Sequence, residues 1–82
     1  MSKIINEPIT VHINNDLELT AFIWRRRFYK IIETLARWHE PSAWWNGEPI
    51  RILLRVTASN RAIGIYELCK LNKNWFLTRL LD

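Results

Sequence analysis

Residues 51–81 read RILLRVTASNRAIGIYELCKLNKNWFLTRLL, and this stretch decides the fold class. Apolar and polar residues alternate along it, which indicates half-buried β-strands. Turn-forming residues interrupt the alternation at 58–60 and at 71–74. Gly64 falls inside the middle segment and predicts a bulge or a close approach of two backbones. The stretch therefore predicts an antiparallel meander of three strands, over residues 51–57, 62–69 and 75–81.

The N-terminal third carries the same pattern. Residues 8–13 and 19–24 alternate and are separated by the turn-forming run Asn-Asn-Asp, so they predict a hairpin. The next turn falls at Arg25 and Arg26, directly before a third strand. Two-residue hairpin turns favour Gly, Asn or Asp because they require positive φ. Either this loop is longer than two residues or one of the arginines adopts a strained conformation.

Residues 27–39 fit both a strand and a helix. Apolar side chains recur at helical spacing from Phe28 to Trp38, whereas the aromatic and β-branched residues at the beginning favour a strand. Residues 39–49 contain Pro, Asn and Gly and predict a loop. That loop includes Trp44 and Trp45, and two adjacent side chains in an extended chain point in opposite directions.

These patterns predict an all-β fold in a single domain, residues 1–82. The expected architecture is a small curled antiparallel sheet or open barrel of five to six strands, with residues 33–39 left open between strand and helix. The chain has 82 residues, of which 49% are hydrophobic, and this content argues against a disordered protein. Five tryptophans supply large, rigid packing surfaces for so small a core.

The chain is basic, with a formal net charge of +4 that is unevenly spread. Residues 25–37 hold five basic residues against the single acidic residue Glu33, whereas residues 1–24 are net acidic. A basic centre favours a polyanionic or acidic partner. The alternative is a solvated surface that keeps a small protein soluble.

Catalytic and cofactor chemistry is poorly represented. Cys69 is the one cysteine and is expected to be buried, while His12 and His39 have no neighbouring partners for a triad or a metal site. Only two glycines are present, so no phosphate-binding glycine loop is predicted. We expect no enzymatic activity, no cofactor, no metal and no membrane contact. Because an apolar leader is missing after Met1, a cytoplasmic location is expected.

Binding is the better-supported kind of function. Arginine forks match phosphates and tryptophan stacks on bases, a combination that small β-barrels use to bind single strands. Nucleic acid is therefore the first expected partner, and the alternative is a protein partner, whose contact sites favour Trp and Arg. The oligomeric state is left open. The candidate binding surface comprises Trp24, Arg25, Arg26, Arg27, Arg37, Trp44, Trp45, Arg51 and Arg55.

Several short motifs resemble a small bacterial domain of unknown function that occurs as a stand-alone protein. The motifs are Phe22-Ile23-Trp24-Arg25, Trp44-Trp45, Tyr66-Glu67-Leu68, Trp75 and the terminal Leu80-Leu81-Asp82. A similar pattern looks like the C-terminal module of inactive Y-family polymerase relatives in mutagenic DNA repair. The resemblance implies a compact antiparallel β fold, favours a strand at 27–39, implies no enzymatic activity and adds a contextual link to DNA repair. This chain departs from the pattern at Arg26, where the pattern has glycine, and at Leu54, where it has an aromatic residue.

Overall fold

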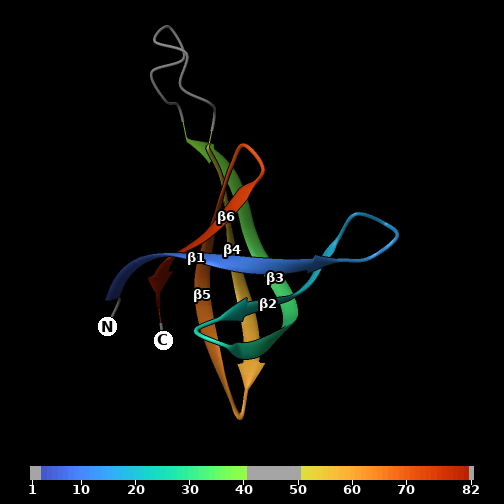
Figure 1. Cartoon of the computed structure of the whole chain (residues 1–82), viewed down its shortest axis with the longest axis vertical. Coiled ribbons are helices and arrows are strands. Elements are labelled where there is room, and N and C mark those ends of the chain that lie inside the picture. The colour runs from blue at the N-terminus through green and yellow to red at the C-terminus, as the bar shows by residue number, and fades with distance from the viewer. Residues whose placement is uncertain (1–2, 41–50, 82) are drawn as a thin grey trace, which may run out of the picture.

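A computed structural model describes residues 3–40 and 51–81. Six antiparallel strands form a closed barrel in which each strand pairs with its neighbours in the sequence and β1 also pairs with β6 (Figure 1). The strands are β1 (Lys3–Ile13), β2 (Leu19–Trp24), β3 (Arg27–Glu40), β4 (Arg51–Asn60), β5 (Ala62–Leu71) and β6 (Asn74–Leu80). The all-β prediction is confirmed, and the barrel is closed rather than open. Residues 3–40 and 51–81 contain no helix, and hence none long and apolar enough to cross a membrane.

Strand β1 closes the barrel because its two halves pair with different partners. Residues 3–9 pair with β6 and residues 10–13 pair with β2. The register shifts between Ile4 and Glu7, where Asn6 has a φ of 53°. Such a bulge bends and twists a strand, which closure of so small a sheet requires.

Residues 27–39, whose sequence fitted both helical and strand periodicity, form a strand. Residues 33–39 lie within β3, which pairs with β4 from Lys30 to Glu40 and contains two register shifts. The extra residues at these shifts are Ile32 and Leu35, and both are exposed. Their helical spacing therefore arises from bulges and not from a helix.

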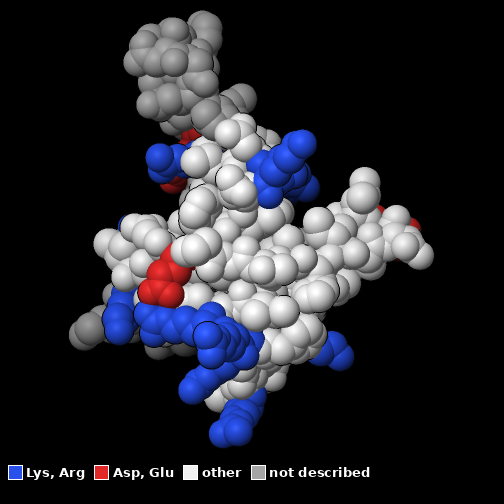
Figure 2. Space-filling model, in the orientation of Figure 1, with Lys and Arg blue, Asp and Glu red and all other residues white. Residues whose placement is uncertain are grey.

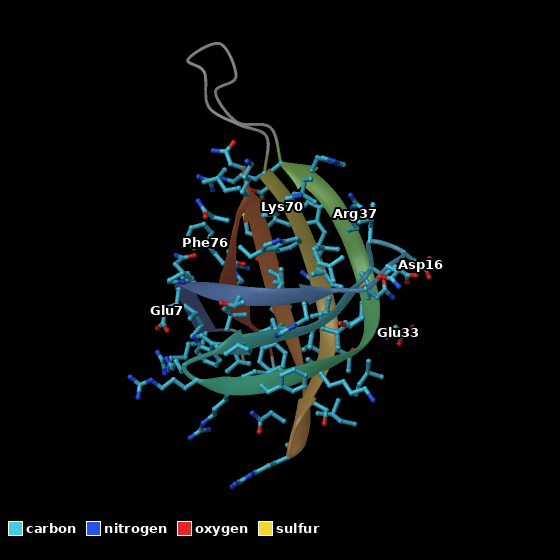
Figure 3. The ribbon with its side chains drawn as sticks, turned by 45° about the vertical axis from the view of Figure 1, so that its right-hand side comes forward. Glu7, Asp16, Glu33, Arg37, Lys70 and Phe76 are labelled. Carbon is cyan, nitrogen blue, oxygen red and sulfur yellow. The ribbon has the colours of Figure 1, made fainter. Side chains whose placement is uncertain are left out.

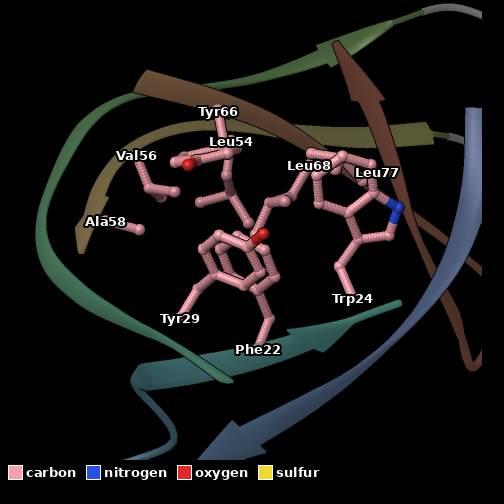
Figure 4. Close-up of a cluster of buried hydrophobic side chains, with 9 residues drawn as sticks. All are labelled: Phe22, Trp24, Tyr29, Leu54, Val56, Ala58, Tyr66, Leu68 and Leu77. Atoms are coloured by element: carbon pink, nitrogen blue, oxygen red, sulfur yellow. The ribbon is translucent and has the colours of Figure 1, made fainter. Parts of the chain in front are cut away.

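The core lies inside the barrel and is built on aromatic contacts (Figure 4). Phe22 and Tyr29 stack with their ring centroids 4.9 Å apart, and the Tyr66 ring meets both at steep angles. Phe22, Leu68 and Leu77 are completely buried. One cluster thereby holds the hairpin of β2 and β3 against the distant strand β5, which stabilises the closed form.

The predicted turn at 58–60 is wrong, because these residues belong to β4 and the chain reverses at Arg61. Ala58 is completely buried and pairs with Gly64, whose strand carries no bulge at that point. The turn after β1 is confirmed, since Asn14 Oδ1 accepts hydrogen bonds from the amides of Asp16 and Glu18, both at 2.9 Å.

Candidate binding surface at one end of the barrel

Two arginine turns lie at the same end of the barrel. The β2–β3 turn consists of Arg25 and Arg26, with φ of 51° and 65°, and the β4–β5 turn contains Arg61, with φ of 65°. Because the strands alternate in direction, both turns fall at one end, below β1 in Figure 1. Positive φ at both central residues is the geometry of a type I′ turn, and it is unfavourable for arginine. Of the two alternatives that the sequence left open, the loop is not longer than two residues, and both arginines, rather than one, adopt the strained conformation.

The first arginine of this turn is held by a carboxylate from β1. Arg25 Nε and Nη2 donate to Glu7 Oε1 and Oε2 at 2.9 and 2.6 Å. The Trp24 indole Nε1 also donates to Glu7 Oε1, at 2.9 Å, and the Arg25 guanidinium carbon lies 4.7 Å from the centre of the Trp24 ring. The hydrogen bond from Arg25, followed by that from Trp24, lowers the pKa of Glu7 to about 2. Glu7 therefore stays ionised and anchors the turn to β1.

This arrangement assigns Trp24 and Arg25 to the fold. The Trp24 side chain is 9% exposed and packs in the core cluster, so its faces are not accessible to a base. The positive charge of Arg25 is compensated by Glu7. Glu7 lies 17 residues before Trp24 in the chain, and the sequence analysis did not identify this contact.

Four other cations at this end have no such partner. Arg26, Arg27, Lys30 and Arg61 are exposed, and within residues 3–40 and 51–81 none forms an ion pair. Basic side chains gather over the lower part of the face shown in Figure 2, with one acidic group beside them. We call the surface formed by Arg26, Arg27, Lys30 and Arg61 the arginine end.

An aromatic side chain lies beside the arginine end. Phe28 is 56% exposed on the outside of β3, and its ring centroid is 6.0 Å from that of His12 in β1. Lys30 follows two residues later on the same side of the strand. Sequence reasoning did not assign Phe28 to the surface, because residues 27–39 fitted a helix and a strand equally well. Their strand alternation places Phe28 and Lys30 on one face.

The remaining predicted residues lie elsewhere. Arg37 and Arg51 are exposed on β3 and β4, and Arg37 lies above β1 in Figure 3, away from the β2–β3 turn. The Arg55 guanidinium carbon is 5.6 Å from the Trp38 ring centre, and Arg55 Nη2 is 3.7 Å from Glu67 Oε1. The predicted surface is thus divided into two regions. The first, at the end of the barrel, holds Arg26 and Arg27, and the second, on β3 and β4, holds Arg37, Arg51 and Arg55. Trp44 and Trp45 lie outside the described residues.

The carboxylate that lies beside Arg55 is mostly buried. Glu67 is 7% exposed, and the Thr78 hydroxyl lies 3.0 Å from its Oε2 atom. Contacts across four strands therefore connect Trp38, Arg55, Glu67 and Thr78 on the outer face of the sheet. Arg55 is engaged in this network, so it is less available than the arginines at the barrel end.

Two kinds of reactive group are relevant to catalysis in the described part of the chain: the thiol of Cys69 and clusters of metal-ligating side chains. Cys69 is buried as expected, and burial raises the pKa of its thiol, which disfavours the reactive thiolate. Within residues 3–40 and 51–81, no group of three His, Cys, Asp or Glu side chains could hold a metal ion. The arrangement is suited to binding an anion next to an aromatic ring.

Comparison with known proteins places the chain in a family. No curated protein and no solved structure matches it. The family match extends over residues 1–82, and the chain belongs to the family described as Domain of unknown function (DUF6504).

Proposed function

We propose that this protein is a non-catalytic module that binds single-stranded nucleic acid at the arginine end. The observation that carries the proposal is the set of four exposed cations, which lack ion-pair partners among the described residues and lie beside exposed Phe28. Phosphates would contact the cations, and a base would stack on Phe28. Single-strand binding proteins combine these two kinds of contact.

The conformation of the turns supports this proposal. Left-handed geometry costs a residue other than glycine about 1–2 kcal/mol, and Arg26 and Arg61 both adopt it. Glycine or asparagine would satisfy the same turns with less strain. Strained residues concentrate at functional sites, and a charge requirement at these positions explains the use of arginine.

The Glu7 contact has a part in this function. By binding Arg25, Glu7 fixes the turn against β1, and the next two residues, Arg26 and Arg27, are exposed. Arg26 and Arg27 are then presented from a rigid turn, so less side-chain and loop entropy is lost on binding. Arg25 is accordingly a positioning residue and not a phosphate contact.

A protein partner, in a DNA-repair assembly, is the second candidate function. The observation that favours it is a set of exposed apolar side chains, with Leu17 at 85%, Ile32 at 54% and Leu35 at 45% exposure. Such residues suit protein contacts better than phosphate contacts. Binding through them would tolerate salt, whereas binding through the arginine end would not.

The test is a fluorescence-anisotropy titration of a labelled oligothymidylate at low and physiological salt. We expect binding at low salt that weakens steeply as salt is added. Arg26→Ala should reduce the affinity, and the matched control Lys73→Ala removes the same charge from the β5–β6 turn, at the other end of the barrel. Equal effects of the two variants would reject the arginine end as the binding surface, and no binding at low salt would reject the function.

A further inference from the structure

The barrel interior widens at the arginine end because the inward side chains of β4 and β5 become small. Val56 pairs with Tyr66 in the aromatic core, but the next inward pair toward the turn is Ala58 and Gly64. Both members of this pair are fully or nearly fully buried. A buried glycine in a strand marks a place where a ligand or another backbone approaches closely.

The space that results is a cup of about 470 Å³. Tyr29 and Tyr66 line its buried part, while Arg27 and Arg61 line its exposed rim. Leu80 of β6 supplies an apolar wall. Small-molecule sites range from about 300 to 1,000 Å³ and occur in the mouths of β-barrels, so the cup has the size and place of such a site.

The two tyrosines leave polar groups available inside the cup. Tyr29 and Tyr66 are 7% and 8% exposed, and both line the cup. Burial, followed by the proximity of Tyr29, raises the pKa of Tyr66, so this phenol remains a hydrogen-bond donor at neutral pH.

We propose that the cup binds the terminal phosphate of a nucleotide, held between Arg27 and Arg61 at the rim, with the edges of Tyr29 and Tyr66 at the floor. Two arginines at the rim select an anionic group, because guanidinium forks match phosphate oxygens. This inference rests on the proposed function, since it makes the cup the position for the phosphorylated end of a bound strand. A free nucleotide presents the same chemistry.

The experiment compares three probes on the intact protein: a 5′-phosphorylated oligothymidylate, the same strand with a 5′-hydroxyl, and free thymidine monophosphate. We expect the phosphorylated strand to bind about tenfold more tightly than the hydroxyl strand, the magnitude typical of an added charge-assisted pair. Arg61→Asn keeps a residue that tolerates positive φ and should remove this preference. Lys73→Ala is the control and should preserve it.

Amide NMR shifts of the unmodified protein locate the ligand independently of any variant. Gly64 and Arg61 amides should move with the phosphorylated strand, while Asn74 at the other end should not. Saturation by the free nucleotide at a similar concentration would support the cup but assign it to a free ligand. Oligonucleotide binding with equal affinity for both strand ends and no shift at Gly64 would overturn the cup and leave the proposed function intact. Nucleotide binding without strand binding would support the cup and reject the proposed function.

Discussion

Replacing Arg26 by glycine should make the protein more stable and a weaker binder of nucleic acid. Arg26 is the second residue of the β2–β3 turn, with a φ of 65°, and it is exposed. Left-handed geometry costs it about 1–2 kcal/mol, which glycine avoids. The greater freedom of glycine in the unfolded chain takes back about 0.5–1 kcal/mol. The central values leave a net gain of about 0.75 kcal/mol, and for a domain of this size the Tm should rise by roughly 3–6 °C.

The same substitution removes one of the four cations of the arginine end. The affinity for a single strand should fall, and the slope of log K against log salt should become shallower by about 0.7, the value for one phosphate contact with a single strand. Circular dichroism melting and anisotropy titrations measure the two effects on one preparation.

The matched control is Lys73→Gly. Lys73 is an exposed residue of the β5–β6 turn and carries the same charge, but its φ is not positive. Glycine there adds freedom to the unfolded chain without relieving strain, so this variant should be less stable than the wild type and should bind nucleic acid as the wild type does. If Arg26→Gly melts at or below the temperature of Lys73→Gly, the argument from backbone strain is wrong.

Three further substitutions test the structural account. The pKa of Glu7 is lowered to about 2, so its contribution to stability is present above pH 4.5 and is lost as the pH falls toward 2; Glu7→Gln should flatten this acid limb in melts between pH 6 and pH 2, and an unchanged limb would contradict the Arg25 contact. Leu68→Ala removes a completely buried side chain and should cost about 2–5 kcal/mol in denaturant unfolding; a loss below 1 kcal/mol would contradict the packed core. Leu17 has a φ of 61° and is 85% exposed, so Leu17→Asn should raise the Tm by a few degrees, and a lowered Tm would show that the exposed leucine contributes contacts.

The strands could be predicted because their evidence is local. Alternation over residues 51–81 reflects burial of one face, and it identifies a strand wherever one side of a sheet covers a core. The segment 27–39 could not be assigned this way, since its two bulges shift the alternation at Ile32 and Leu35. Its strand conformation is supported by pairing with β4, which is a tertiary interaction.

The misplaced turn at 58–60 has a related cause. Ser and Asn are common in turns, but Ala58 lies inside the barrel, where it pairs with Gly64. The chain therefore continues as a strand and reverses at Arg61. Local composition does not reveal that residues common in turns are paired with an opposing strand.

The candidate site was only partly accessible to sequence reasoning. The cluster of arginines after Trp24 is visible in the sequence. The sequence does not show that Arg25 is bound by a carboxylate while Arg26 and Arg27 are not. Glu7 reaches Arg25 because the β1 register brings them together, and that register depends on the bulge at Asn6. The register of β1 thus makes Arg25 part of the fold and leaves Arg26 at the surface.

The salt dependence of single-strand binding tests the central claim most directly. The account predicts that an oligothymidylate binds at low salt and that log K falls linearly with log salt, with a slope of about −2 to −3 for three to four phosphate contacts. Binding that is absent at low salt, or that is unchanged between low and physiological salt, would contradict it.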